Sequence, residues 1–374
     1  MKQVGISQVD AVFSNGSYPI EFLFYYEQAF DTRRLRSALQ KLSSIFWPAF
    51  GKYGNGAIVF DDYREAEYFD EEAVDRELDI AEVGESGAGV ISRFALPPLE
   101  RLFFLRAIRF KNGLVLIPKM NHLAGDGYSY FLFLSVLAAL ARPTLVPFKS
   151  VLMNFALKPD HRRMALRDFS FRGFELKPLA PPGNLRIEEE EILRRDVQAT
   201  IQEAASSSGL RVSGNDVLSA LAMKRLVKAG AHSWPEDVRL TMPIDVRGKV
   251  KEYGRGFFGN GIMFHTLTLK REDIEAFPAR AVAIQIRQSM PFLSRETYVD
   301  FLGRLEEILS AGRWDEFRPY DPERGCLVTN LSRLPADKLD FGTGPPRLSI
   351  PLTIEKNGAA ILSRKEDYLL RLAY

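Results

Sequence analysis

The sequence is poor in cysteine and histidine. Cys326 is the single cysteine among 374 residues, so the chain forms no internal disulfide and no multi-cysteine metal site. It fits no nucleophile motif, and we interpret it as a buried or incidental residue. With only four histidines present, each is first expected to be an ordinary core or surface residue unless its setting argues otherwise.

The chain also lacks an excess of charge of either sign and a long apolar run. Its 50 basic and 48 acidic residues leave a formal charge of +2, which does not favour nucleic acid or an anionic membrane as the main partner. The longest apolar run, Tyr128 to Ala141, is too short to span a bilayer. Met1 to Asp10 lacks the basic and apolar regions of a secretory signal, so we expect a cytoplasmic protein.

The sequence does contain enough apolar material for a large core. Hydrophobic residues make up 46% and charged residues 26%, as in an ordinary soluble globular enzyme, and the length favours more than one domain. Pro147 to Gly183 is rich in proline, basic residues and short aromatic clusters, which indicates a crossover between domains. We therefore predict domains over residues 1–146 and 185–374, joined by a linker over 147–184.

Apolar periodicity and turn residues predict strands and helices in both halves of the chain. We expect strands at residues 20–26, 56–60, 102–110, 114–117, 239–247, 262–269 and 327–331. We expect helices at residues 31–42, 128–141, 196–205, 217–229 and 298–310. The acidic segment from Asp61 to Glu85 is predicted to be loop, and two strands are predicted around Lys356-Asn357-Gly358.

The stretch from Pro118 to Gly127 carries a histidine and a carboxylate in one predicted turn. The apolar segments before it are separated by Lys111-Asn112-Gly113, which predicts a hairpin whose second strand ends at His122. Two glycines flank Asp126, so a helical metal-binding pair is disfavoured. A histidine at a strand end, followed by a turn and a helix, suits a positioned general base, with a core or surface histidine as the alternative.

The run His122-Leu123-Ala124-Gly125-Asp126-Gly127 matches HxxxDG, the signature of the chloramphenicol-acetyltransferase-like superfamily. This superfamily includes the BAHD acyltransferases and the condensation domains of peptide synthetases. Asn121, before the histidine, is more similar to BAHD usage than to the double histidine of condensation domains.

Further segments resemble BAHD elements in the expected order, so that the resemblance covers roughly Pro19 to Pro346. Thr343 stands where the family has a tryptophan, and the chain is shorter than typical plant members. The matching segments are Asn215 to Leu221, Asp245-Val246-Arg247, Phe258-Gly259-Asn260, Thr329 to Pro335, and Asp340-Phe341-Gly342-Thr343-Gly344.

The resemblance implies an α/β fold, layered as α+β, in which two chloramphenicol-acetyltransferase-like domains face each other across a central cleft or tunnel. It implies an enzyme of specialised metabolism that moves an acyl group from acyl-CoA to a hydroxyl or amine of a small-molecule acceptor. No metal, permanently bound cofactor or covalent acyl-enzyme is implied. A condensation-type enzyme with an acyl-carrier-protein donor and a non-catalytic ligand-binding homologue are the alternatives.

The resemblance also implies roles for individual residues. His122 is the implied general base, and an ordinary imidazole with a pKa near ~6.5 can be neutral at cytoplasmic pH. Asp126 is implied to pair with Arg247 instead of relaying protons, and Thr329 to approach the developing oxyanion. The alternative for Arg247 is an ordinary surface arginine, and the alternative for Thr329 is a threonine that merely suits a strand. The residues implied to support the site or shape the donor tunnel are Gly127, Arg247, Asn260, Asp340, Phe341, Gly342 and Gly344.

Overall fold

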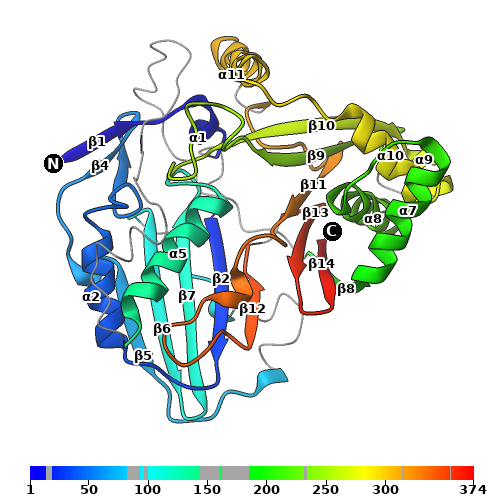
Figure 1. Ribbon diagram of the computed structural model, residues 1–374. Helices are drawn as coiled ribbons and strands as arrows, with labels where there is room; N and C mark the ends of the chain where they lie inside the picture. The colour runs from blue at the N-terminus through cyan, green and yellow to red at the C-terminus, as the bar shows by residue number, and fades with distance from the viewer. Residues whose placement is uncertain are drawn as a thin grey trace.

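The computed structural model builds the chain from three β-sheets and the helices around them (Figure 1). The described residues are 1–13, 19–81, 93–96, 100–143, 161, 185–230, 234–313, 316–353 and 355–374. The predicted linker over residues 147–184 therefore lies outside the described residues, apart from His161.

The first half of the chain forms most of a five-stranded sheet, with strand order β12-β2-β7-β6-β5. In that order the strands are Leu348–Pro351, Pro19–Tyr26, Gly113–Asn121, Phe103–Phe110 and Phe69–Ala73. Helices α2 (Thr32–Leu42) and α5 (Gly127–Ala141) pack against each other over one face of this sheet (Figure 1). Their apolar side chains and those of β2, β6 and β7 form one continuous core.

The second half forms a six-stranded sheet, with strand order β10-β9-β11-β13-β14-β8. In that order the strands are Ile262–Lys270, Asp237–Asp245, Gly325–Asn330, Gly358–Ser363, Asp367–Ala373 and Ile187–Leu193. Helices α7 (Arg194–Ser208), α8 (Gly214–Ala229) and α10 (Ala279–Ser289) pack together, and α8 lies on β11, β13 and β14 (Figure 1). The short helix α9 (Arg271–Ala276) follows β10 and contacts α8.

Smaller elements bring the two halves together at the N-terminus. The third sheet has the order β1-β4-β3, and the short helix α1 packs against α11 of the second half. These elements are β1 (Lys2–Gly5), α1 (Gln8–Val12), β3 (Lys52–Gly54), β4 (Ala57–Phe60) and α11 (Arg295–Ser310), with short 3-10 turns at Glu65–Glu67 and Ala336–Lys338.

The six-stranded sheet has two different faces because successive side chains of a strand point in opposite directions. Ile361 of β13 and Leu370 of β14 belong to the core that also contains the apolar residues of α8. Thr329, Ala360 and Arg371 stand in register on β11, β13 and β14 and line a cavity with residues of the five-stranded sheet. This inner face positions the candidate site.

Many expected elements are present. Helix α2 starts after Asp31, whose side chain accepts a hydrogen bond from the Arg33 amide, and α8 starts after Ser213 with a capping box. Helix α7 ends at Gly209, which adopts φ +68. The hairpin of β6 and β7 and the buried helix α5 also lie where the sequence predicts them. The α/β fold class is confirmed.

The loop predicted from Asp61 to Glu85 is wrong in part, because Phe69–Ala73 forms strand β5 at the edge of the five-stranded sheet. β5 pairs in parallel with β6. Its acidic side chains find basic partners on β6, as in the ion pair of Asp70 with Arg106. Pairing with the distant strand β6 therefore makes this segment a strand, which its acidic composition does not predict.

The two strands around Lys356-Asn357-Gly358 exist, but they do not pair with each other as a hairpin. Asn357 has φ +56 in the turn. β12, before the turn, pairs with β2 of the five-stranded sheet, and β13, after it, pairs with β11 and β14. The predicted division at residues 146 and 185 is therefore crossed by one strand, since β12 of the second half completes the sheet of the first half.

Candidate functional site

Strand β7 carries the chain to His122. Met120 pairs with Ile20 of β2, and Asn121 with Pro19, so the strand stays paired until its last residue. The Asn121 side chain then accepts a hydrogen bond from the Leu123 amide at 3.0 Å, and its carbonyl accepts one from the Ala124 amide at 2.9 Å. These two bonds turn the chain directly after the strand and leave His122 at the turn.

Asn260 determines which nitrogen of His122 carries the proton. Its Nδ2 donates to Asp10 Oδ1 at 2.7 Å and to the His122 carbonyl oxygen at 2.8 Å, so its Oδ1 faces His122 Nδ1 at 3.0 Å. An amide oxygen only accepts hydrogen bonds, and Nδ1 must therefore donate. The neutral ring then has its lone pair on Nε2, the nitrogen that can take a proton.

The N-terminal segment holds the other side of the histidine ring. Phe13 stacks on His122 with ring centroids 3.6 Å apart and an interplanar angle of 13°. Asp10, which accepts from Asn260, is itself bound through Oδ2 by the amide and hydroxyl of Ser7 at 2.8 Å each. The ring is therefore fixed by a stack, a side-chain amide and its own strand.

Burial lowers the pKa of His122 to about 4, against the opposing effect of the nearby Asp126 carboxylate. The apolar ring of Phe13 and the cavity wall leave the imidazolium poorly solvated, which disfavours the charged form. At neutral pH the ring is therefore unprotonated on Nε2. The pKa of His122 is thus lower than the ordinary imidazole value of about 6.5, which favours the neutral ring that the sequence predicts.

Asp126 and Arg247 form a buried ion pair, as the family resemblance implies. Arg247 Nη1 and Nη2 donate to the two carboxylate oxygens at 2.8 and 3.0 Å, and both side chains are 3% exposed. Asp126 also caps α5 by accepting from the Ser129 amide at 2.9 Å and accepts from the Gly261 amide at 2.8 Å. The carboxylate thus joins the turn after β7 to the 259–261 corner of the second half.

The surroundings of this ion pair are tightly packed. Arg247 Nη2 also donates to the Ser129 hydroxyl at 3.0 Å and to the Gly259 carbonyl at 2.9 Å. A Cβ atom at Gly125 would come within 2.7 Å of Ser129 Cβ, and one at Gly261 within 2.8 Å of Arg247 Cζ. Glycine fits both positions because the side chains of Ser129 and Arg247 occupy the space that a Cβ atom would take.

A cavity of about 160 Å³ lies between the two large sheets and includes His122 in its wall. Thr329 and Gly127, both predicted site residues, line the same cavity. Much of the remaining wall is apolar, from Ile20 and Phe22 on β2 to Leu327 on β11. The structure thus brings together His122 and Thr329 from opposite halves of the chain.

The segment from Asp340 to Gly344 lies outside this cavity wall. Asp340 Oδ1 accepts from the amides of Gly342 and Gly344 at 2.7 and 3.0 Å, and its carboxylate pairs with Arg142 after α5. The Phe341 ring is buried and stacks on Phe30 with centroids 4.9 Å apart. These contacts favour the structural interpretation of the segment over the tunnel-shaping one.

A second, more polar pocket lies at the ends of α7, α8 and β11. Three arginines line it, Arg194, Arg195 and Arg333. Asn330, the residue after Thr329, also lines it and donates to Asn215 Oδ1 at 2.7 Å. Guanidinium groups gathered in this way suit phosphate oxygens.

Sequence reasoning missed several residues that contact the site. Asp10 and Phe13 reach it only because α1 packs against the second half, although Ser7 and Asp10 have the spacing of a capping box and predict a helix start. Ser129 holds Arg247, and Arg371 lines the cavity from β14. Only strand register brings Arg371 into the site, and a single sequence does not show that register.

Three further features of the described residues concern metal ligands, the cysteine and membrane helices. Within those ranges no three His, Cys, Asp or Glu side chains cluster as metal ligands. Cys326 is buried, and burial raises the pKa of its thiol to about 12. No helix in the described part of the chain is both long and apolar enough to cross a membrane.

Comparison with known proteins places the chain in a family. Residues 90–368, more than half of the chain, match the Transferase family. Anthranilate N-benzoyltransferase protein 2 from Dianthus caryophyllus is 25% identical over 271 residues, which are 66% of this chain and 58% of that protein. The chain thus spans less than two thirds of the length of this curated relative.

Solved structures share the fold at low sequence identity. F. graminearum TRI101 complexed with coenzyme A and deoxynivalenol superposes with a TM-score of 0.75 at 12% identity, covering 100% of this chain and 95% of its own. Vinorine synthase gives 0.69 at 16% identity, covering 100% and 90%. The first condensation domain of the CDA synthetase gives 0.60 at 15% identity, again covering 100% and 90%. The chain belongs to the Transferase family, the BAHD acyltransferases that its HxxxDG motif indicated, and has their fold.

Proposed function

We propose that the protein is an acyltransferase that moves an acyl group from acyl-CoA to a hydroxyl or amine of a small-molecule acceptor. One observation carries this proposal. His122, with Nδ1 bound to Asn260 Oδ1 and Nε2 left unprotonated, lies in the wall of a largely apolar cavity opposite Thr329. A general base, an oxyanion donor and a water-poor pocket are the parts that acyl transfer needs.

The proposed reaction is an addition to the thioester carbonyl followed by elimination of the thiolate, with no covalent acyl-enzyme. The acceptor oxygen or nitrogen attacks the thioester carbonyl carbon while His122 Nε2 takes the acceptor proton. The C–S bond then breaks, and the departing thiolate receives that proton from His122. The Thr329 hydroxyl donates to the oxyanion of the tetrahedral intermediate, a contact that commonly lowers the barrier by about 2 to 4 kcal/mol.

The supporting residues keep this geometry and stay out of the proton transfer. Asn260 selects the tautomer, and the Asp126–Arg247 pair holds the turn that carries His122. We assign Gly127 to the same support, because it starts α5 and lines the cavity beneath the turn. The segment with Asp340, Phe341, Gly342 and Gly344 is proposed to be structural.

The donor is proposed to be acyl-CoA, with its phosphates at the pocket of Arg194, Arg195 and Arg333. Asn330, which lines that pocket, is the last residue of β11, and Thr329 beside it lines the cavity on the opposite face of the sheet, so the proposed donor would pass around the end of this strand. The TRI101 structures complexed with coenzyme A support this donor, and the curated relatives make benzoyl transfer to anthranilate a suitable first assay. We propose a cytoplasmic enzyme without a permanently bound cofactor. Its two domains are proposed to divide at residues 146 and 185, with strand β12 of the second domain in the sheet of the first.

The experiment is a donor screen with the purified protein. Benzoyl-CoA and acetyl-CoA are offered with small amines and alcohols, anthranilate among them, and the acylated acceptor and free CoA are measured by mass spectrometry. The same acyl groups on an acyl carrier protein form the second arm. Acyl transfer from free acyl-CoA supports the proposal, whereas a strict requirement for the carrier would assign the protein to the condensation type. Tight binding of compounds without any transfer would make it a non-catalytic ligand-binding homologue.

A further inference from the structure

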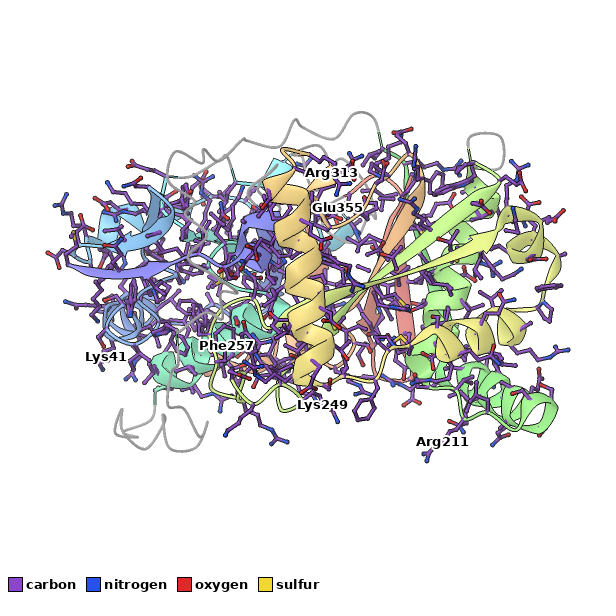
Figure 2. All side chains as sticks on the ribbon, turned by 90° about the horizontal axis from the view of Figure 1, so that it is seen from above. Lys41, Arg211, Lys249, Phe257, Arg313 and Glu355 are labelled. Carbon is purple, nitrogen blue, oxygen red and sulfur yellow. The ribbon has the colours of Figure 1, made fainter. Side chains whose placement is uncertain are left out.

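Two residues that line the cavity at His122 each carry a buried polar atom that has no hydrogen-bond partner among the described residues. These atoms are Arg371 Nη2 and Glu355 Oε2. Figure 2 labels Glu355 near the middle of the molecule. A buried donor or acceptor without a partner costs free energy, so unmatched groups in a cavity indicate what its ligand supplies.

Arg371 is fixed in place by its strand and by one ion pair. It lies on β14, where Ala360 of β13 separates it from Thr329 of β11. Two strand spacings place its Cα roughly 10 Å from that of Thr329 across the sheet. Its side chain is 5% exposed, and Nη1 pairs with Glu189 of β8. Nη2 has no hydrogen-bond partner within the described part of the chain.

We propose that Arg371 binds a carboxylate group of the substrate that occupies the cavity. This inference rests on the proposed function, since it concerns the substrate of the same site. A guanidinium N–H donates a strong, charge-assisted hydrogen bond to a carboxylate. The small Ala360 side chain leaves room between Arg371 and Thr329, and the apolar wall around Phe22, Phe131 and Leu327 suits a compact hydrocarbon body. The substrate class is thus a small aromatic or aliphatic acid.

The other charged groups of the cavity do not supply this contact. Glu21 is occupied, because its oxygens accept from the Leu96 amide at 2.6 Å and pair with Lys119 at 3.3 Å. Glu355 repels a carboxylate when it is ionised, and in the protonated form, which its raised pKa of about 7 favours, it offers a donor without a positive charge. Arg371 is therefore the one cation among the described cavity-lining residues, and Glu355→Gln is a matched control that removes the acidic group from the same wall.

The carboxylate can come from the acceptor or from the acyl chain, and two substrate pairs distinguish these sources. Anthranilate and aniline, with a common donor, differ by a carboxylate on the acceptor. Succinyl-CoA and butyryl-CoA, with a common acceptor, differ by a carboxylate at the end of an acyl chain of equal length. The ratio of kcat/KM within each pair is measured for the wild type, Arg371→Gln and Glu355→Gln.

Arg371→Gln is expected to lower kcat/KM by about 10- to 100-fold for the acid of one pair, since one charge-assisted hydrogen bond is lost. The neutral partner should change by no more than about twofold, as for a site that the substitution does not touch. Glu355→Gln should leave the preference for the acid in place. Equal changes for both members of each pair in Arg371→Gln would overturn the inference, while acyl transfer itself would still stand.

Two further measurements keep the outcome decisive. If Arg371→Gln fails to fold because Glu189 is left unpaired, the double variant Arg371→Gln with Glu189→Gln restores neutrality and takes its place. If no acyl transfer occurs with any pair, the proposed function fails, and calorimetric titration with anthranilate, aniline, succinate and butyramide tests the inference alone. Loss of binding of an acid in the Arg371 variant supports it, and equal binding of all four compounds by the wild type and the variant contradicts it.

Discussion

At the scale of single residues, the directions of the hydrogen bonds around the His122 imidazole determine the chemistry of the site. The Asn260 amide has both of its hydrogens committed to acceptors, Asp10 Oδ1 and the His122 carbonyl, so its oxygen can face only a donor. The tautomer of His122 follows from that count. HxxxDG indicates the histidine, but nothing in the motif indicates that Asn260, 138 residues away, selects its protonation.

Replacing Asn260 by alanine should reduce kcat by about 10- to 100-fold, because the ring loses the partner that fixes its tautomer and angle. KM should change much less, since Asn260 does not line the cavity. Steady-state kinetics measure the separation of kcat from KM. A rise in KM with unchanged kcat would show that Asn260 shapes binding and does not position the base.

Thr329 offers a conservative pair of substitutions. Thr329→Ser keeps the hydroxyl and should retain most activity, whereas Thr329→Val keeps the shape and removes the donor. The valine variant should lose about 2 to 4 kcal/mol of transition-state stabilisation, seen as a lower kcat. Equal activity of the serine and valine variants would exclude an oxyanion contact.

The lowered pKa of His122 predicts a pH dependence. The folded-state pKa is about 4 and the unfolded value is 6.5, so only the unfolded chain takes up this proton between those values. The contribution of His122 to stability is complete above pH 6.5 and is lost as the pH falls toward 4. Glu355 acts in the opposite sense, because burial raises its folded-state pKa from 4.5 to about 7. Its contribution is present below pH 4.5 and is lost as the pH rises through 7.

Urea unfolding of the wild type and of His122→Gln at pH 7.5 and pH 5 separates the two residues, because Glu355 titrates equally in both proteins. The wild type should lose more stability than the variant at the lower pH. In the pH profile of kcat/KM, the apparent pKa of the acidic limb should likewise lie nearer 4 than 6.5. An apparent pKa near 6.5 would show that the histidine is solvated.

At the scale of elements, the turn and capping residues of the sequence predicted those helices and hairpins that contacts between neighbouring residues form. The Lys111-Asn112-Gly113 turn, the capping residues Asp31 and Ser213, and helix α5 follow from turn and capping chemistry. Strand β5, the pairing of β12 with β2 and the contact of α1 with α11 depend on partners far along the chain. For that reason Phe13 and Arg371 could not be placed from the sequence.

The Asp126–Arg247 pair links α5 to the corner at residues 259–261, and its loss should weaken both elements. Asp126→Ala leaves a guanidinium that is 3% exposed with only the carboxylate of Asp245, whose side chain is 50% exposed. The loss should therefore approach but not exceed the about 3 to 5 kcal/mol that a fully unpaired buried charge typically costs. Chemical denaturation measures the loss. A double variant with Arg247→Met should recover part of it, and additivity of the two substitutions would show that the pair is not coupled.

At the scale of the whole molecule, both halves of the chain contribute to the core and to the strands of the five-stranded sheet, while a second core lies entirely in the second half. The core of the five-stranded sheet includes Val246, Phe258 and Phe301 from the second half, and β12 completes the sheet itself. The family resemblance indicated two domains around a cleft. It did not indicate how far residues of one half build the other, because that depends on long-range packing.

This shared core predicts cooperative unfolding. Calorimetry should find a single thermal transition with equal calorimetric and van't Hoff enthalpies, although the length alone would allow two. Two resolved transitions would show that the halves are held together less tightly than β12 and the common core imply.

Single-turnover acyl transfer by His122→Ala measures whether His122 removes the acceptor proton. With acyl-CoA and the best acceptor from the screen, the rate of acyl transfer should fall by about 100- to 10,000-fold relative to the wild type, as expected for the loss of a general base. Binding of acyl-CoA, followed by calorimetry, should be retained. Transfer at close to the wild-type rate by a folded His122→Ala protein would show that His122 is not the general base.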